Sequence, residues 1–215
     1  VERYKNVELC GFRNIYNEEK VEQFAAVTYI VNGKPVIAVR GTDDTIVGWK
    51  EDFNIAWQEQ IPAQKDSLEY FKEAASAFNG DFVLVGHSKG GNLVINTAVR
   101  CGSELQKRIN EVYNFDGPGF ATDFFKSPEY KAVEGKIRSF YPGFSVVGMI
   151  FHHPANFEIV KSDGFAFWQH DAMNWQIMGS NFINEGKFAD ESRLFYKVFN
   201  EWIDKLDKKK KKSFV

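Results

Sequence analysis

The stretch FVLVGHSKGGNLV, residues 82–94, decides how the middle of this chain folds. It opens with a short, continuously apolar run, which is typical of a central parallel strand buried on both faces. From Gly90 onward the spacing of apolar residues is helical. Ser88 therefore stands in the turn between a strand and a helix.

This turn has the pattern Gly-x-Ser-x-Gly, because residues 86–90 read GHSKG. Such a turn forces the serine into a strained backbone conformation that lifts its hydroxyl above the sheet, and Gly86 and Gly90 must be small because neighbouring main chain packs against them. The following helix points its first amides at negative charge that develops nearby. The alternative is a small residue in a tight turn. The flanking strand and helix favour Ser88 as a nucleophile.

A nucleophilic serine needs a base, and the chain has four histidines. His170 follows the predicted strand at residues 156–162, on the loop where the base belongs. His87 is adjacent to the serine, and its side chain is expected to point away from the hydroxyl in a structural role. His152 and His153 are interpreted as a surface or loop pair. We predict that His170 is the base.

The acid that orients this base is predicted to be Asp116, which ends the strand EVYNF, residues 111–115, on the same edge of the sheet as the serine. The alternative role of Asp116 is to form the turn at the following Gly-Pro-Gly. A competing position for the acid lies after the next strand, where the chain offers only Ser145. Asp163 and Asp171 are lesser candidates.

Two donors are expected to form an oxyanion hole. One is the backbone amide of Lys89, directly after the nucleophile. The other is assigned to Thr42, in the first strand-to-helix loop, VRGTDDT. Asp43 and Asp44 in this loop are interpreted as solvated residues or caps.

The remaining segments complete an α/β pattern with a mostly parallel central sheet. Residues 21–40 read as two strands around the turn Asn32-Gly33, a strong hairpin signal. A helix is expected to start near Trp49. Further elements are predicted as a helix at 66–78 capped by Asp66 or Ser67, strands at 81–87, 136–142 and 156–162, and a helical apolar stripe at 190–206. We expect one domain over residues 1–215.

The composition and net charge of the chain argue against several classes of protein. A net charge of −2 gives no basic field for nucleic acid, and no apolar stretch is long enough for a membrane span. Two distant cysteines, Cys10 and Cys101, indicate a reduced, cytoplasmic setting. No histidine and carboxylate cluster has the spacing of metal ligands, so no metal or cofactor is expected. The chain opens on Val1 rather than methionine, which is compatible with a fragment of a longer chain.

Four segments in this order carry a resemblance to a bacterial family of lipase-like α/β-hydrolases, which is similar to the fungal-type (class 3) lipases. They are AVRGTDDTIVGWKEDF, VGHSKGGNL, NFDGPGF and QHDAMNW, within roughly residues 20 to 180. Two positions depart from the fungal pattern. Lys89 stands where leucine is usual, and Ser145 stands where the acid is usual, whereas pancreatic-type lipases keep their acid at the position of Asp116.

The resemblance implies a lipase-like α/β-hydrolase fold with an N-terminal hairpin and hydrolysis of a small-molecule or lipid ester. Two other readings stay open: a non-catalytic binding or scaffolding module on the same fold, and a thioesterase or peptidase with the same triad. Several aromatic residues lie near the candidate loops, either as an acyl-binding groove or as ordinary packing; they are Phe144, Phe151, Phe165, Phe167 and Trp168.

Overall fold

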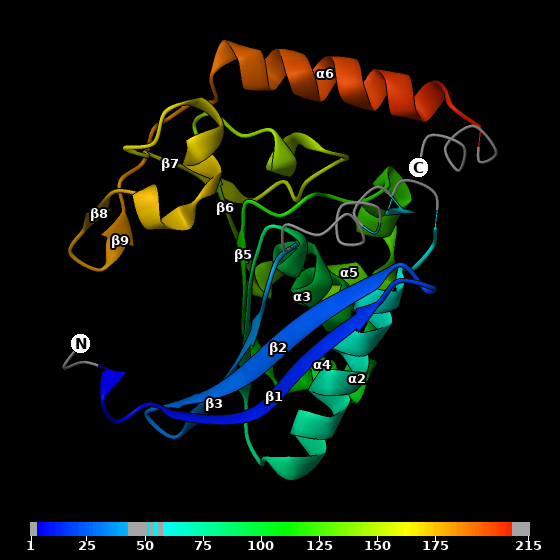
Figure 1. The fold of residues 1–215 in the computed structure, drawn as a ribbon, viewed down its shortest axis with the longest axis vertical. Helices are drawn as coiled ribbons and strands as arrows, with labels where there is room; N and C mark the ends of the chain where they lie inside the picture. The colour runs from blue at the N-terminus through cyan, green and yellow to red at the C-terminus, as the bar shows by residue number, and fades with distance from the viewer. Residues whose placement is uncertain (1–3, 43–50, 52–53, 56–57, 208–215) are drawn as a thin grey trace.

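A seven-stranded sheet forms the centre of the molecule, and its strands are ordered as they follow in the chain (Figure 1). The computed structural model describes residues 4–42, 51, 54–55 and 58–207. The first three strands are antiparallel, and the strands from β3 to β7 are parallel. The strands are β1 (Glu8–Asn17), β2 (Glu22–Val31), β3 (Lys34–Val39), β4 (Phe82–His87), β5 (Ile109–Phe115), β6 (Ile137–Pro142) and β7 (Phe157–Val160). The predicted mostly parallel sheet is confirmed.

The N-terminal hairpin is also confirmed, since β2 and β3 pair through Val31 and Lys34 around a two-residue turn. Both turn residues have positive φ, 51° at Asn32 and 74° at Gly33, as a tight hairpin turn requires. Strand β1, which the sequence pattern does not predict, pairs with β2 at the edge of the sheet. A shift of register in β1 interrupts the alternation of side chains that would have revealed it.

Helices α2 (Pro62–Ala77), α3 (Lys89–Arg100), α4 (Ser103–Lys107) and α5 (Pro128–Val133) lie together on one side of the sheet (Figure 1). The main core is packed between them and the strands. In β4, Phe82 and Leu84 are buried while Val83 and Val85 are only half-buried. The expectation that this strand is buried on both faces is therefore wrong, because the described helices that cover it, α2 to α5, lie on a single side.

Helix α2 begins four residues earlier than predicted, so Asp66 and Ser67 lie inside the helix and do not cap it. Pro62 occupies the first turn, where its fixed φ suits a helix and its missing N–H costs nothing. The main-chain N–H of Ile61 donates to Gln64 Oε1 at 3.0 Å. This side chain folds back onto the helix start, a role that polar composition alone does not reveal.

The described chain after β7 extends beyond the sheet. A short hairpin of β8 (Ile177–Met178) and β9 (Asn181–Phe182) precedes α6 (Asp190–Lys205), which crosses the end of the molecule (Figure 1). The predicted helix at 190–206 is confirmed, but its apolar stripe is only partly covered: Ile203 is buried, whereas Leu194 and Val198 are exposed. In the described residues, no helix combines the length and apolar character that crossing a membrane needs. Trp49, the predicted start of another helix, lies outside the described residues.

Candidate active site

Ser88 occupies a sharp turn between β4 and α3, with φ 56° and ψ −133°. A left-handed φ is strained for a serine and persists only where the surrounding structure enforces it. A Cβ added to Gly86 would lie 2.1 Å from the Gly90 carbonyl oxygen, and one added to Gly90 would lie 2.2 Å from the Val39 carbonyl oxygen. Both positions therefore accept glycine alone, as the pattern Gly-x-Ser-x-Gly predicts.

Hydrogen bonds of the main chain hold this turn against the next strand. The N–H of Ser88 donates to the carbonyl oxygen of Phe115 at 2.9 Å, and the N–H of Gly91 donates to the carbonyl oxygen of Ser88 at 2.9 Å. Phe115 is the last residue of β5, and Asp116 follows it. The turn that carries Ser88 is thus joined directly to the residue before Asp116.

Asp116 and His170, which are 54 positions apart, meet at this edge of the sheet. His170 Nδ1 lies 2.7 Å from Asp116 Oδ2, with the Asp116 side chain fully buried and the His170 side chain 20% exposed. Because an ionised carboxylate only accepts hydrogen bonds, Nδ1 is the donor and a neutral ring keeps Nε2 as its proton acceptor. This is the geometry of an acid that orients a base.

The structure does not favour the alternatives to Asp116 as the acid paired with His170. The hydrogen bond that closes the turn after β5 runs from the Gly117 N–H to Asn114 Oδ1 at 3.0 Å, so Asn114 rather than Asp116 stabilises the turn. Asp163 accepts from the Gln176 side chain, and Asp171 accepts from a nearby main-chain N–H. Neither of these two carboxylates is paired with His170.

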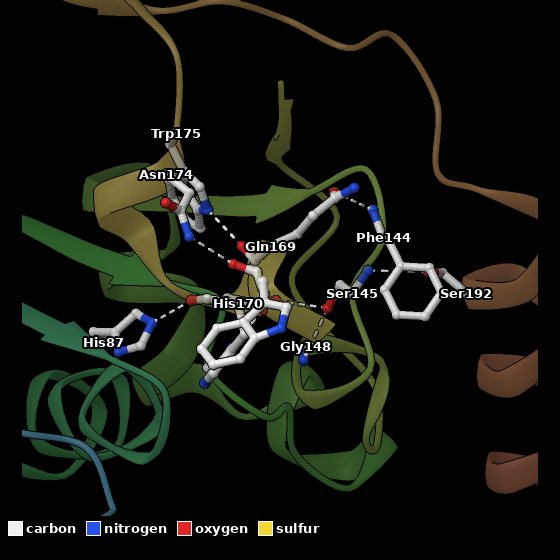
Figure 2. A network of polar contacts seen from close by, with 12 residues as sticks. His87, Phe144, Ser145, Gly148, Gln169, His170, Asn174, Trp175 and Ser192 are labelled. Atoms are coloured by element: carbon white, nitrogen blue, oxygen red, sulfur yellow. Dashed lines mark hydrogen bonds and ion pairs between the residues drawn. The ribbon is translucent and has the colours of Figure 1, made fainter. Parts of the chain in front are cut away.

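Ser145 does not take the place of the acid. It contacts the carboxylate of Asp116, a role that the sequence pattern does not predict. Its hydroxyl donates to Asp116 Oδ1 at 2.6 Å and accepts from the Gly148 N–H at 3.1 Å. Its own N–H donates to Ser192 Oγ of α6 at 3.0 Å (Figure 2). Both oxygens of Asp116 are therefore occupied, one by the histidine and one by a serine that α6 supports.

The segment around His170 is held by further hydrogen bonds (Figure 2). The ring nitrogen Nε2 of His87 lies 2.7 Å from the His170 carbonyl oxygen and is its donor. Burial lowers the pKa of His87, so its ring stays neutral. Gln169 accepts from the Phe144 N–H through its side chain and from Trp175 Nε1 through its carbonyl oxygen. His87 has the predicted structural role, and its partner is the main chain of the candidate base.

Within the described residues, no hydrogen bond joins Ser88 to His170. The ring of His170 lies with its centroid 4.6 Å from that of His87, the residue before Ser88. The hydrogen bond between a nucleophile and its base is often long in a free enzyme and shortens when substrate binds.

The other two histidines lie away from this pair. His152 Nδ1 is 3.0 Å from the Tyr196 hydroxyl of α6. His153 packs against the rings of Tyr141 and Phe157, and burial lowers its pKa. Of the two alternatives expected for this pair, a surface or a loop position, the loop position is confirmed, and His153 is half-buried in an aromatic cluster.

The two residues expected to supply oxyanion donors are both near Ser88 in the chain or in space. Lys89 is the first residue of α3, where a main-chain N–H has no partner within the helix. A Cβ added to Gly41 would lie 2.8 Å from Ser88 Cβ, so the main chain just before Thr42 packs against Ser88. Asp43 and Asp44 lie outside the described residues. No group of three or more His, Cys, Asp or Glu side chains is arranged to bind a metal in the part of the chain that the structure describes.

Apolar side chains are exposed in the segment that carries His170. Phe165 is 85% exposed, Trp168 is 74% exposed and Met173 is 90% exposed. Phe151, by contrast, is buried and packs against Phe199. Of the aromatic residues noted in the sequence, those beside His170 face solvent, and Phe151 belongs to ordinary packing.

Solved structures of lipases have a similar fold. The fold is similar to that of M37 lipase, with a TM-score of 0.54 and 16% identity over 70% of this chain. It is also similar to that of Lip2 lipase from Yarrowia lipolytica, with a TM-score of 0.56 and 12% identity over 93% of this chain and 79% of that one. The chain spans 60% of the length of M37 lipase. At such identities the likeness concerns the fold alone.

A search among curated proteins finds no match to the sequence. The model of the Mbeg1-like family matches residues 1–215. The molecule has the lipase-like α/β-hydrolase fold, and the chain belongs to the Mbeg1-like family.

Proposed function

We propose that this protein is a serine hydrolase that cleaves carboxylic esters. The observation that carries the proposal is the 2.7 Å contact between His170 and the buried Asp116, on the same edge of the sheet as a strained Ser88. A nucleophile, a base and an orienting acid are the three groups that acyl transfer requires. Their chain order of serine, acid and histidine is that of α/β-hydrolases.

The reaction has two halves. Ser88 Oγ attacks the acyl carbonyl as His170 Nε2 takes its proton, and the proton then passes to the departing alkoxide as the ester bond breaks. Water next attacks the acyl-serine as His170 takes a proton from it, and His170 returns this proton to Ser88 Oγ as the bond to the acyl group breaks and the free acid leaves. The amides of Lys89 and Thr42 hold the negative oxygen that forms in each half.

The exposed apolar residues support an ester with an apolar acyl or alcohol group. Phe165, Trp168 and Met173 lie within five positions of His170 and present their side chains to solvent. When an apolar substrate chain packs against such side chains, it leaves water, and the gain in free energy is proportional to the apolar area that is buried. A lipid ester or a small aromatic ester fits this environment better than a charged one.

The proposal is tested with Ser88→Ala. The variant is expected to lose labelling by a fluorophosphonate probe and to lose p-nitrophenyl ester turnover, by about 10⁴-fold to 10⁶-fold. Ser127 provides a matched control, since its hydroxyl caps α5 away from this site. Ser127→Ala should label and turn over ester like the wild type.

Two outcomes would contradict parts of the proposal. A wild-type chain that neither labels nor turns over any ester of a graded series is not a serine hydrolase. Labelling that persists in Ser88→Ala would move the nucleophile to another residue. Mass spectrometry of the labelled peptide identifies which residue carries the phosphonate.

A further inference from the structure

A fully buried ion pair includes Lys89, the residue that follows Ser88. The Lys89 ammonium group is 2.9 Å from Glu51 Oε2, with both side chains completely shielded from solvent. The pair is separate from the contact between Asp116 and His170, and the proposed reaction uses only the backbone amide of Lys89. The charged side chains of this pair therefore have no role in the chemistry described so far.

All three donors of the Lys89 ammonium group have an acceptor. Lys89 Nζ donates to the Gln23 carbonyl oxygen at 2.8 Å and to Gln23 Oε1 at 2.9 Å, in addition to Glu51. An ammonium group has three donors, and all three are used. A lysine beside a serine acts as the base in some hydrolases. The Lys89 ammonium is committed to three acceptors on β2 and Glu51, so it does not serve as the base.

Glu51 connects three separate parts of the fold. Its Oε2 also accepts from the Gln23 N–H at 3.0 Å, and its Oε1 accepts from the Ala63 N–H at 2.9 Å. Gln23 belongs to β2, and Ala63 lies in the first turn of α2. Glu51 thus joins the sheet, the start of α2 and the first residue of α3 in one buried cluster.

Stability alone does not account for such a cluster. Removing two charges from water costs more than their attraction returns unless the geometry is excellent, and apolar replacements of a buried pair are often neutral or stabilising. What a buried pair does provide is a fixed distance between the elements that carry its members, because either charge is costly once separated from the other. A role in positioning therefore fits these residues better than a role in stability.

We infer that the cluster of Lys89, Glu51 and Gln23 positions one donor of the oxyanion hole, the Lys89 amide. The Lys89 side chain is tied to β2 through Gln23 and to Glu51, so the first residue of α3, which carries this amide, is held against these two partners. Lys89 through its side chain, together with Glu51, is thus a positioning residue that keeps this donor in place beside Ser88. This inference rests on the proposed ester hydrolysis and adds the part of the structure that aligns it.

The test separates alignment from stability with three variants. Lys89→Met and Glu51→Gln each leave one buried partner without its counterpart, so both are expected to lower the melting temperature. The double variant Lys89→Met/Glu51→Gln contains no unpaired buried charge, so its melting temperature should recover toward that of the wild type. Because the ion pair is absent in all three, kcat should stay about 10-fold to 100-fold below wild type in each, with KM changed less than about threefold.

Lys136→Met is the matched control. This half-buried lysine donates to the carbonyl oxygens of Gln106 and Ile109, at 2.9 Å and 2.6 Å, on another part of the chain. Its loss should change the melting temperature and leave kcat unchanged. All rates are measured well below the melting temperatures and per labelled active site, so that unfolded protein does not count as slow protein.

Two results would overturn the inference in distinguishable ways. A double variant whose kcat recovers together with its melting temperature shows that the cluster is only structural, while the ester hydrolase stands. A wild-type chain without labelling or turnover removes the proposed function, and the inference that rests on it falls as well.

Discussion

Ser145→Ala is the substitution that most directly probes how Asp116, the proposed triad acid, is held. The Ser145 hydroxyl is the donor to Asp116 Oδ1 at 2.6 Å, and Asp116 is fully buried. Alanine removes the hydroxyl without adding bulk. The remaining oxygen, Oδ2, keeps its contact with His170, so the change isolates the support of the acid from the pairing itself.

The magnitude follows from the bond that is lost. A hydrogen bond to a charged group contributes about 1.5 to 3 kcal/mol. If all of it acts by keeping the carboxylate aligned with His170, kcat falls by about 10-fold to 150-fold, since each 1.36 kcal/mol is a factor of about ten in rate. The Gly148 N–H also loses its acceptor, so unfolding becomes easier by about 1 to 3 kcal/mol.

The assay compares kcat for an activated ester with the free energy of unfolding from urea titration. Ser67→Ala is the control, because Ser67 is a buried serine whose hydroxyl lies 2.8 Å from the Thr97 hydroxyl, between α2 and α3. This control should lose a similar stability and keep its kcat. The reasoning is refuted if Ser145→Ala loses stability as the control does but turns over ester at the wild-type rate.

Three further substitutions test the site and its surroundings. Asp116→Asn offers His170 an amide in place of a carboxylate, favours the wrong tautomer, and should lower kcat by about 10³-fold to 10⁴-fold in stopped assays of ester cleavage; a loss of less than tenfold would return this residue to a turn-forming role. Gly90→Ala places a Cβ 2.2 Å from a main-chain oxygen of β3 and should abolish probe labelling and lower the urea midpoint, whereas Gly135→Ala, where a Cβ meets nothing within 4 Å, should do neither; equal midpoints would contradict the packing argument. Burial, and then the neighbouring carboxylates, raises the pKa of Asp66 to about 7. Folded protein thus keeps a proton that the unfolded chain releases above about pH 4, so stability should fall between about pH 4 and pH 7, and Asp66→Asn should flatten this fall in urea titrations; equal slopes in both proteins would refute it.

The sequence alone determined the hairpin of β2 and β3, the core strands β4 to β7 and the turn that carries Ser88. These features depend on local patterns: a short apolar strand, two glycines at fixed spacing, and a helical repeat directly after them. The approach of Asp116 to His170 was also within reach of sequence reasoning. Both follow predicted parallel strands, and the carboxyl ends of such strands meet at one edge of a sheet.

Only the tertiary structure decided what supports these residues. Ser145 reaches Asp116 across 29 positions of sequence, and Lys89 reaches Glu51 across 38 positions and Gln23 across 66. Hydrogen bonds between such distant side chains follow no period, so no pattern in a single sequence announces them. The one-sided covering of β4 has the same origin, because an apolar run does not reveal on which side the helices pack. Local sequence patterns predict where Ser88, Asp116 and His170 lie along the strands and turns. Hydrogen bonds between segments far apart in the sequence hold them in position.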